Sequence, residues 1–320
     1  MFTVSNFKKS FLILSLFLIP LISCKNDKED SQNQKETTTK TNKAKKVIEV
    51  VTNDMDFQIP SRIKSGWTTF KYNNKSPETH FFIFEKMPEG VTIENYNNEL
   101  VPPFKAAFNH LLNDEMEKAM QEFEKVPAWW NDVKLGGGVG LISPKSVAES
   151  TIYMHPGTYV MECYVRMPNG MPHAFYGMLK EIEVTEEKND NREPSYDHKI
   201  SISSIEGITF QDSIKAGDYQ LAINFKDQKQ YETLLGHDVN LVRLDTISKL
   251  DTLGNWINAA NIKAFRTPVP KGLKFLGGVE DLEEGETGYF KTQLKKGTYV
   301  LISEIPNVLE RKMYKTFKVY

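Results

Sequence analysis

The stretch PGTYVMECYVRMPNGMPHAFYGM, residues 156–178, begins like a β-strand and then supplies a cysteine, a histidine and a methionine. Residues Thr158 to Val165 are rich in β-branched and aromatic side chains, which is typical of a strand. Cys163 lies near the end of this predicted strand, and His173 and Met178 follow across one loop. A buried core cysteine with chance neighbours is one interpretation, and a metal site is the other.

This stretch also belongs to an internal repeat. Residues 157–160 (GTYV) recur as 297–300, and residues 135–139 (LGGGV) recur as 275–279 (FLGGV). Both matches have one offset, because 157 to 297 and 138 to 278 each differ by 140. Two spaced matches at one offset predict a duplicated domain.

We assign the two copies to residues 47–187 and 198–320, joined by a polar, proline-containing linker at 188–197. Short runs such as Trp67–Tyr72 and His80–Phe84 are aromatic or β-branched and are bounded by turn signals. This pattern favours an all-β fold of two tandem sandwiches.

One helix is expected to interrupt the first copy as an insertion. After Pro102-Pro103, apolar residues recur at helical spacing from Phe104 to Phe123. We expect this apolar stripe to pack against the sandwich rather than to line a ligand pocket. Trp129-Trp130 is expected to be an aromatic plug, with a binding platform as the alternative.

The first 24 residues predict a lipoprotein signal peptide. Lys8-Lys9 precede an apolar run at 11–22 that is too short to span a bilayer. The run ends in Leu-Ile-Ser-Cys at 21–24, which resembles the lipobox of bacterial lipoproteins, and that resemblance implies that Cys24 is acylated. An ordinary secretory signal with a chance cysteine is the alternative.

Residues 25–46 contain no aromatic residue and no aliphatic residue larger than alanine, which predicts a flexible tether. Lys28-Glu29-Asp30 resembles the surface-export signal of some Bacteroidetes lipoproteins. We therefore expect an outer membrane lipoprotein of the cell envelope, anchored to the membrane by lipid, on the periplasmic face or at the cell surface. The formal net charge of −2 provides no bulk attraction for nucleic acid.

The cysteine count then constrains Cys163. The chain has two cysteines, and once Cys24 carries lipid the other has no partner for an intramolecular disulfide. The envelope is oxidising, so a single thiol there is expected to be buried, metal-bound or reactive.

The order of these residues resembles the cupredoxins, the fold of plastocyanin and of the copper domains of nitrite reductases. Residues 73–84 (NNKSPETHFFIF) match an Asn-rich turn followed by an early histidine, His80, and a core strand. Cys163, His173 and Met178 match the later Cys-loop-His-spacer-Met order. The resemblance implies a Greek-key sandwich with one mononuclear copper, held by His80, Cys163 and His173 in the equatorial plane and by Met178 as the weak axial ligand.

The resemblance is not complete. Nine residues separate Cys163 from His173, more than in plastocyanin, so the loop could hold this histidine in a distorted position. Met167 and Met171 also lie in the loop, but Met178 alone has the family spacing after the histidine.

Two other histidines are not expected to be ligands. His155 begins the strand that leads to Cys163, so at 3.3 Å per residue it lies roughly 26 Å away. His110 belongs to the helical insertion and is expected at the surface.

The implied function is one-electron transfer or copper holding. The rival is a metal-free binding module of the envelope, in which the same residues only pack. The chain has no His-x-His pair for a second, catalytic copper. An enzyme acting on a surface polymer is a third possibility, but no nucleophile motif or recognisable carboxylate pair supports it.

The second copy acts as an internal control. The offset of 140 places Ser303 opposite Cys163, while His237 stands opposite His80 and Met313 opposite Met178. This copy lacks the thiolate and one imidazole, so residues 198–320 are expected to form a degenerate domain without a metal site. A docking or spacing role toward an unidentified redox or protein partner is expected for it.

Overall fold

The computed structural model describes residues 46–232, 234 and 236–320, and within these ranges the chain is mainly β with a helical insertion, as predicted. Cys24, the signal peptide and the tether up to residue 45 lie outside the described residues. No helix in the described ranges is both long and apolar enough to cross a membrane.

The strands divide between the two copies. Those of the first copy are β1 (Val47–Asn53), β2 (Asp56–Gln58), β3 (Arg62–Asn74), β4 (His80–Lys86), β5 (Lys134–Ile142), β6 (Ser146–Met154), β7 (Gly157–Glu162) and β8 (Leu179–Lys188). Those of the second are β9 (His198–Ser203), β10 (Gly207–Thr209), β11 (Ser213–Ile214), β12 (Gly217–Phe225), β13 (Val239–Leu244), β14 (Leu273–Val279), β15 (Thr287–Leu294), β16 (Gly297–Ile302) and β17 (Tyr314–Val319).

The helical elements lie mostly in two connections. Between β4 and β5 the chain forms α1 (Ile93–Asn95), the π-helical turn η1 (Tyr96–Leu100), α2 (Val101–Leu112), α3 (Met116–Phe123) and the 3₁₀ turn η2 (Ala128–Asp132). Another 3₁₀ turn, η3 (His173–Tyr176), precedes β8, and η4 (Ile247–Lys249) with α4 (Leu250–Ile257) connects β13 to β14.

The strands form two layers, and each layer runs through both copies. One layer has the order β2-β1-β3-β6-β15-β12-β9-β10. The other has the order β8-β7-β4-β5-β14-β13-β16-β17-β11, and the first residues of β3 also pair in parallel with β8 at its outer edge. The copies meet where β6 pairs with β15 and β5 with β14, and equivalent strands follow outward on both sides.

One apolar core lies between the layers and includes side chains of both copies. In the first copy, Phe70 of β3 packs against Phe82 of β4 with ring centroids 5.9 Å apart, which joins one layer to the other. Both copies belong to the same compact unit, Ala44–Tyr320, and independent folding of residues 198–320 stays a prediction.

The glycine repeat marks the same strand irregularity in both copies. Gly138 and Gly278 lie where the registers of the β4–β5 and β13–β14 pairs shift. A Cβ atom at Gly138 would lie 1.9 Å from the carbonyl oxygen of Phe82, and one at Gly278 would lie 1.9 Å from that of Val239. Only glycine permits this approach of backbone to backbone, which explains why the motif recurs.

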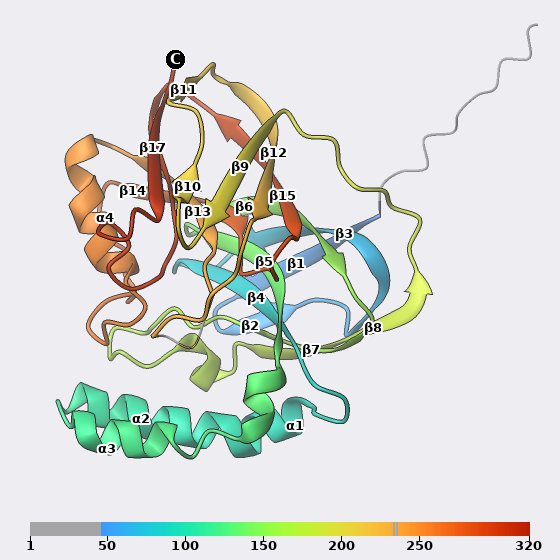
Figure 1. Ribbon diagram of the computed structural model, residues 1–320, viewed down its shortest axis with the longest axis vertical. Coiled ribbons are helices and arrows are strands. Elements are labelled where there is room, and N and C mark those ends of the chain that lie inside the picture. The colour runs from blue at the N-terminus through green and yellow to red at the C-terminus, as the bar shows by residue number, and fades with distance from the viewer. Residues whose placement is uncertain (1–45, 233, 235) are drawn as a thin grey trace, which may run out of the picture. The chain divides into compact units, whose positions relative to one another are not determined.

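The prediction of one continuous helix in the insertion is wrong. The chain forms α2 and α3, which lie side by side (Figure 1), with a break at Asn113–Glu115. Asp114 adopts φ 58°, a left-handed conformation that Asp tolerates and that ends a helix. Side-chain periodicity continues across this break, so the apolar pattern does not reveal it.

The expectation that the insertion only packs against the sandwich also needs correction. Met116 and Met120 of α3 are 61% and 54% exposed. With Phe104 and Phe108 of α2 they line a cavity of about 640 Å³, whose polar side includes Arg166. Trp129 and Trp130 pack on the small apolar cluster around Met87 and Tyr96, and Trp130 also lines the cavity.

The strand carrying the cysteine is shorter than predicted. β7 ends at Glu162 rather than at Val165, so Cys163 is the first residue after the strand. Its N–H still donates to the carbonyl of Met178 (3.3 Å), and its carbonyl accepts from the N–H of Ala174 (2.9 Å). These bonds to the returning loop replace the regular ladder.

Candidate metal centre

Three side chains from separate parts of the first copy converge at one end of the sandwich. His80 is the first residue of β4, Cys163 follows the neighbouring strand β7, and His173 begins η3. Cys163 Sγ lies 3.8 Å from His80 Nδ1 and 3.7 Å from His173 Nδ1, and the two Nδ1 atoms are 3.1 Å apart. All three side chains are fully buried.

The donor atoms suit one metal ion. Two imidazole nitrogens and a sulfur surround one point, and their spacings of 3.1–3.8 Å leave room for an ion about 2 Å from each. Without an ion, the two Nδ1 atoms can form a hydrogen bond with each other only if one of them carries a proton. The chemistry of the set, one thiol with two imidazoles, is that of soft and borderline transition metals.

Met178 is joined to this group through its backbone. Its N–H donates to the carbonyl of His173 (3.3 Å) and its carbonyl accepts from the N–H of Cys163, while its side chain is fully buried. Met167 and Met171 instead pair with one another, because the N–H of Met167 donates to the carbonyl of Met171 (2.8 Å). The four predicted ligands thus form one buried group that resembles a type 1 copper site.

The turn between β3 and β4 orients both imidazoles. Asn74 accepts from the N–H of Ser76 (3.0 Å) and donates to the carbonyl of Glu78 (2.8 Å), which holds the turn closed. Ser76 Oγ lies 3.0 Å from His80 Nε2. Glu78 Oε2 lies 3.3 Å from His173 Nε2, within ion-pair range but not aligned as a hydrogen bond.

These contacts place an oxygen beside each Nε2, while each Nδ1 faces Cys163 Sγ. Sequence reasoning identified the Asn-rich turn only as a marker of the early histidine. It missed Ser76 and Glu78, whose only local signal was their place between Asn74 and His80.

Burial determines the protonation of the metal-free group. It lowers the pKa of His80 to about 4, and together with the neighbouring imidazole it lowers the pKa of His173 to about 3. It raises the pKa of Cys163 to about 12, although backbone hydrogen bonds from Phe81 and Val165 act in the opposite direction. At neutral pH both imidazoles are therefore ready to ligate, whereas the thiol must lose its proton.

The second copy and the insertion hold the ligand loop. The Arg166 guanidinium donates to the carbonyls of Asn261 (2.7 Å), Ala264 (2.9 Å) and Ala259 of the second copy. Phe108 of α2 packs edge-on against Phe175, two residues after His173. This loop is therefore constrained from two sides.

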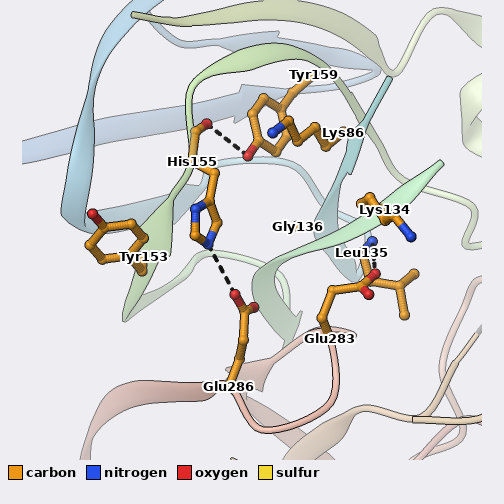
Figure 2. Close-up of a pocket in the computed structure, with 9 residues that line it drawn as sticks. All are labelled: Lys86, Lys134, Leu135, Gly136, Tyr153, His155, Tyr159, Glu283 and Glu286. Atoms are coloured by element: carbon orange, nitrogen blue, oxygen red, sulfur yellow. Dashed lines mark hydrogen bonds and ion pairs between the residues drawn. The ribbon is translucent and has the colours of Figure 1, made fainter. Parts of the chain in front are cut away.

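The two histidines that were not expected to be ligands, His110 and His155, lie elsewhere. Figure 2 shows His155 directed at Glu286, and its Nε2 lies 3.1 Å from Oε1 of that glutamate, beside a cavity of about 130 Å³. His110 Nδ1 lies 2.7 Å from Oε2 of Glu115 in the insertion.

The equivalent place in the second copy lacks the thiolate and one imidazole. In the first copy Ile83 pairs with Glu162, and in the second Asn240 pairs with Ile302. His80 and His237 each lie three residues before the first member of their pair. Cys163 and Ser303 each follow the second member, so the two copies place these residues equivalently. Ser303 Oγ donates to Asp238 (2.7 Å) rather than facing an imidazole.

No protein-family model matches this sequence, and no curated protein sequence is detectably similar to it. Its structure is similar to auracyanin A, a "blue" copper protein of Chloroflexus aurantiacus, with 18% identity and a TM-score of 0.26 over 43% of this chain and 98% of that one. It is similar to a copper-containing nitrite reductase of Thermus scotoductus, with 11% identity and a TM-score of 0.22 over 86% of this chain and 61% of that one. It is also similar to a multicopper oxidase, with 12% identity and a TM-score of 0.21 over 85% and 87%.

These alignments are distant, and the cupredoxin-like character of the chain rests on its own strand order and ligand group. A two-layer β fold carries a histidine at the head of one strand and a cysteine just after the neighbouring strand. The loop after that cysteine returns a histidine and a methionine to the same place. That arrangement is the one that the sequence resemblance to cupredoxins implies.

Proposed function

We propose that this protein binds one copper ion in its first copy and acts as a one-electron carrier or copper-holding protein of the cell envelope. The convergence of His80 Nδ1, Cys163 Sγ and His173 Nδ1 in a fully buried space beside Met178 carries the proposal. Copper bound there would supply a Cu(I)/Cu(II) couple.

The protein's own groups favour electron transfer over bond-making. The three ligands are fully buried and the loop that returns His173 is held by Arg166, so the site excludes solvent and resists rearrangement. A rigid site holds the ligands in nearly the same positions for Cu(I) and Cu(II), so electron transfer requires little movement of the ligands. Glu78 is 25% exposed and covers the outer edge of His173, so the route to solvent is short on that side.

The envelope location is proposed from the sequence alone. Cys24 would carry the lipid anchor, and residues 25–46 would tether the described part of the chain to the membrane. Lipid labelling that is lost in Cys24→Ser would support this anchor, whereas undiminished labelling would exclude it.

The test of the copper site is addition of Cu(II) to the purified protein under oxidising conditions. We expect one equivalent to bind and to give an intense visible band from thiolate-to-copper charge transfer, as the cupredoxin resemblance implies. Cys163→Ser replaces the soft thiolate with a hard, protonated hydroxyl, so the band should be absent while far-UV circular dichroism stays unchanged.

Met171→Leu is the matched control, because Met171 is a buried methionine of the same loop, and the band should persist in it. A wild-type protein that stays colourless with excess Cu(II) would reject the copper site and favour a metal-free binding module.

A further inference from the structure

Three buried carboxylates meet at one end of the second copy. Asp238 immediately precedes β13, Glu280 immediately follows β14, and Glu304 lies two residues after β16. Because β13 pairs antiparallel with both β14 and β16, these three positions share one edge of the layer. One carboxylate oxygen from each lies within 4.8 Å of the others, and no side chain of the three is more than 3% exposed.

Among the described residues, hydrogen-bond donors are distributed unevenly over these three carboxylates. Asp238 accepts from Ser303 Oγ (2.7 Å), from the Glu304 N–H (2.8 Å) and from Asn240. Glu304 Oε1 accepts from the Tyr164 hydroxyl, but its Oε2 has no donor. Glu280 is fully buried, and neither of its oxygens has a donor.

The nearby guanidinium does not resolve this imbalance. Arg166 is close enough to Glu304 for each to influence the other's ionisation, but three of its N–H contacts go to backbone carbonyls of residues 259–264. Glu280 therefore has no positive partner among the described hydrogen bonds and ion pairs. A buried, unpaired carboxylate is costly unless a cation or a proton accompanies it.

We propose that Asp238, Glu280 and Glu304 bind a hard divalent cation of the Ca²⁺ or Mn²⁺ class. The donor set consists of carboxylate oxygens alone, which is the set that such ions prefer and that copper(I) does not. Glu280 supplies two uncommitted oxygens and Glu304 supplies one. This proposal departs from the expectation that residues 198–320 hold no metal.

The position of the cluster follows from the duplication. Asp238 follows His237, the equivalent of His80 in the first copy. Glu304 follows Ser303, the equivalent of Cys163. The second copy therefore has oxygen donors one residue away from the places where the first copy has soft donors. Tyr164, the residue after Cys163, donates to Glu304 and so links the two groups directly.

Manganese is the probe for the test, because free Mn²⁺ gives an electron paramagnetic resonance signal that disappears on binding. At pH 7.5 the full chain should bind one equivalent of Mn²⁺, and Ca²⁺ should compete for it. Glu280→Gln keeps the shape and removes the charge, so it should weaken binding on the order of 100-fold. Glu304→Gln should do the same and provides a second variant if the first fails to fold.

Two controls separate this site from other carboxylates and from the copper ligands. Glu85→Gln alters another buried glutamate with an unpartnered oxygen that lies outside the cluster, and should bind Mn²⁺ like the wild type. Cys163→Ser should also bind Mn²⁺ normally, so the result is independent of the copper proposal. Thermal unfolding offers a second readout, since Mn²⁺ should raise the melting temperature of the wild type but not of Glu280→Gln.

Absence of Mn²⁺ binding by the wild type would overturn the proposal and would leave protons as the only companions of these carboxylates. Binding of equal strength in Glu280→Gln and Glu304→Gln, or its loss in Cys163→Ser, would place the ion elsewhere and would overturn it too.

Discussion

At the scale of single residues, the candidate centre depends on which nitrogen of each imidazole points inward. Both Nδ1 atoms face Cys163 Sγ, and Ser76 and Glu78 lie beside the two Nε2 atoms. A carboxylate or hydroxyl at Nε2 fixes the tautomer and the ring orientation of a metal-bound histidine. The ligands and the turn that orients them therefore act together.

Met178→Leu should leave the visible band in place but shift the reduction potential of the copper form. Leucine conserves the buried volume and removes only the weak thioether contact, so the equatorial ligands stay where they are. Spectroelectrochemical titration measures the potential, with Met171→Leu as the control. Equal potentials in Met178→Leu and the wild type would exclude an axial role for Met178.

Ser76→Ala should weaken copper binding by about tenfold or more, because it removes the hydrogen-bond partner of His80 Nε2. Competition with a chelator of known affinity measures the change. Ser146→Ala is the control, since the hydroxyl of this half-buried serine donates to the carbonyl of Pro144 in a local turn. If both variants retain wild-type affinity, Ser76 does not orient the ligand.

At the scale of elements, the ligand loop is held by partners that are distant in the sequence. Arg166 reaches across to the carbonyls of residues 259–264, and Phe108 of α2 packs on the turn that begins at His173. Nine residues separate Cys163 from His173, and these contacts hold that loop in place. The second copy therefore supports the centre physically as well as adjoining it.

Arg166→Lys should lower the free energy of unfolding by about 2–5 kcal/mol, because lysine cannot reproduce the forked contacts to three buried carbonyls. The copper band should also broaden as the loop loosens. Urea unfolding measures the first effect, and Arg62→Lys is the control, since Arg62 forms an exposed ion pair with Glu183. A loss no larger than that of Arg62→Lys would contradict the role assigned to Arg166.

At the scale of the whole molecule, the two copies share one apolar core and concentrate buried acids near their junction. Burial raises the pKa of Asp281 to about 8, of Glu162 to about 7 and of Asp238 to about 6. For Asp238 the low-dielectric surroundings outweigh the hydrogen bonds that it accepts, and for Asp281 those surroundings act together with the neighbouring Asp238 carboxylate. Between about pH 6 and pH 8 these carboxyl groups are therefore protonated to a larger extent in the folded state than in the unfolded chain, where carboxyl pKa values lie near 4.

The metal-free protein should therefore become more stable as the pH falls from about 8 to about 6.5, because the folded state binds more protons than the unfolded state in this window. Below about 6.5 the sign reverses for His80 and His173, since the unfolded chain protonates imidazoles whose folded pKa values are about 4 and 3. Urea unfolding at intervals of pH measures the profile.

Glu280→Gln should flatten this profile, because burial and neighbouring carboxylates hold the pKa of Glu280 well above its usual range. Glu89→Gln, at an exposed position, should leave it unchanged. A wild-type stability that is constant or falls from pH 8 to 6.5 would show that the buried acids are not protonated as described.

The sequence by itself determined the β class, and it predicted the duplication and the four candidate ligands. These features are local or periodic: strand patterns alternate within a few residues, the repeat has one offset, and Cys163, His173 and Met178 lie within one loop. The glycine motif was visible for the same reason, although its cause, backbone oxygens 1.9 Å from an added Cβ, was not.

Only the tertiary structure decided which distant residues complete and support the site. Asp238, Glu280 and Glu304 are 42 and 24 positions apart in turn, and only the pairing of β13 with β14 and β16 brings them together. The break between α2 and α3 and the end of β7 at Glu162 were likewise decided by backbone conformation and hydrogen bonding, which side-chain periodicity does not record. Strand order and burial are properties of the packed chain. The buried carboxylates and the contacts that hold the ligand loop depend on them, so these features have no local signal in the sequence.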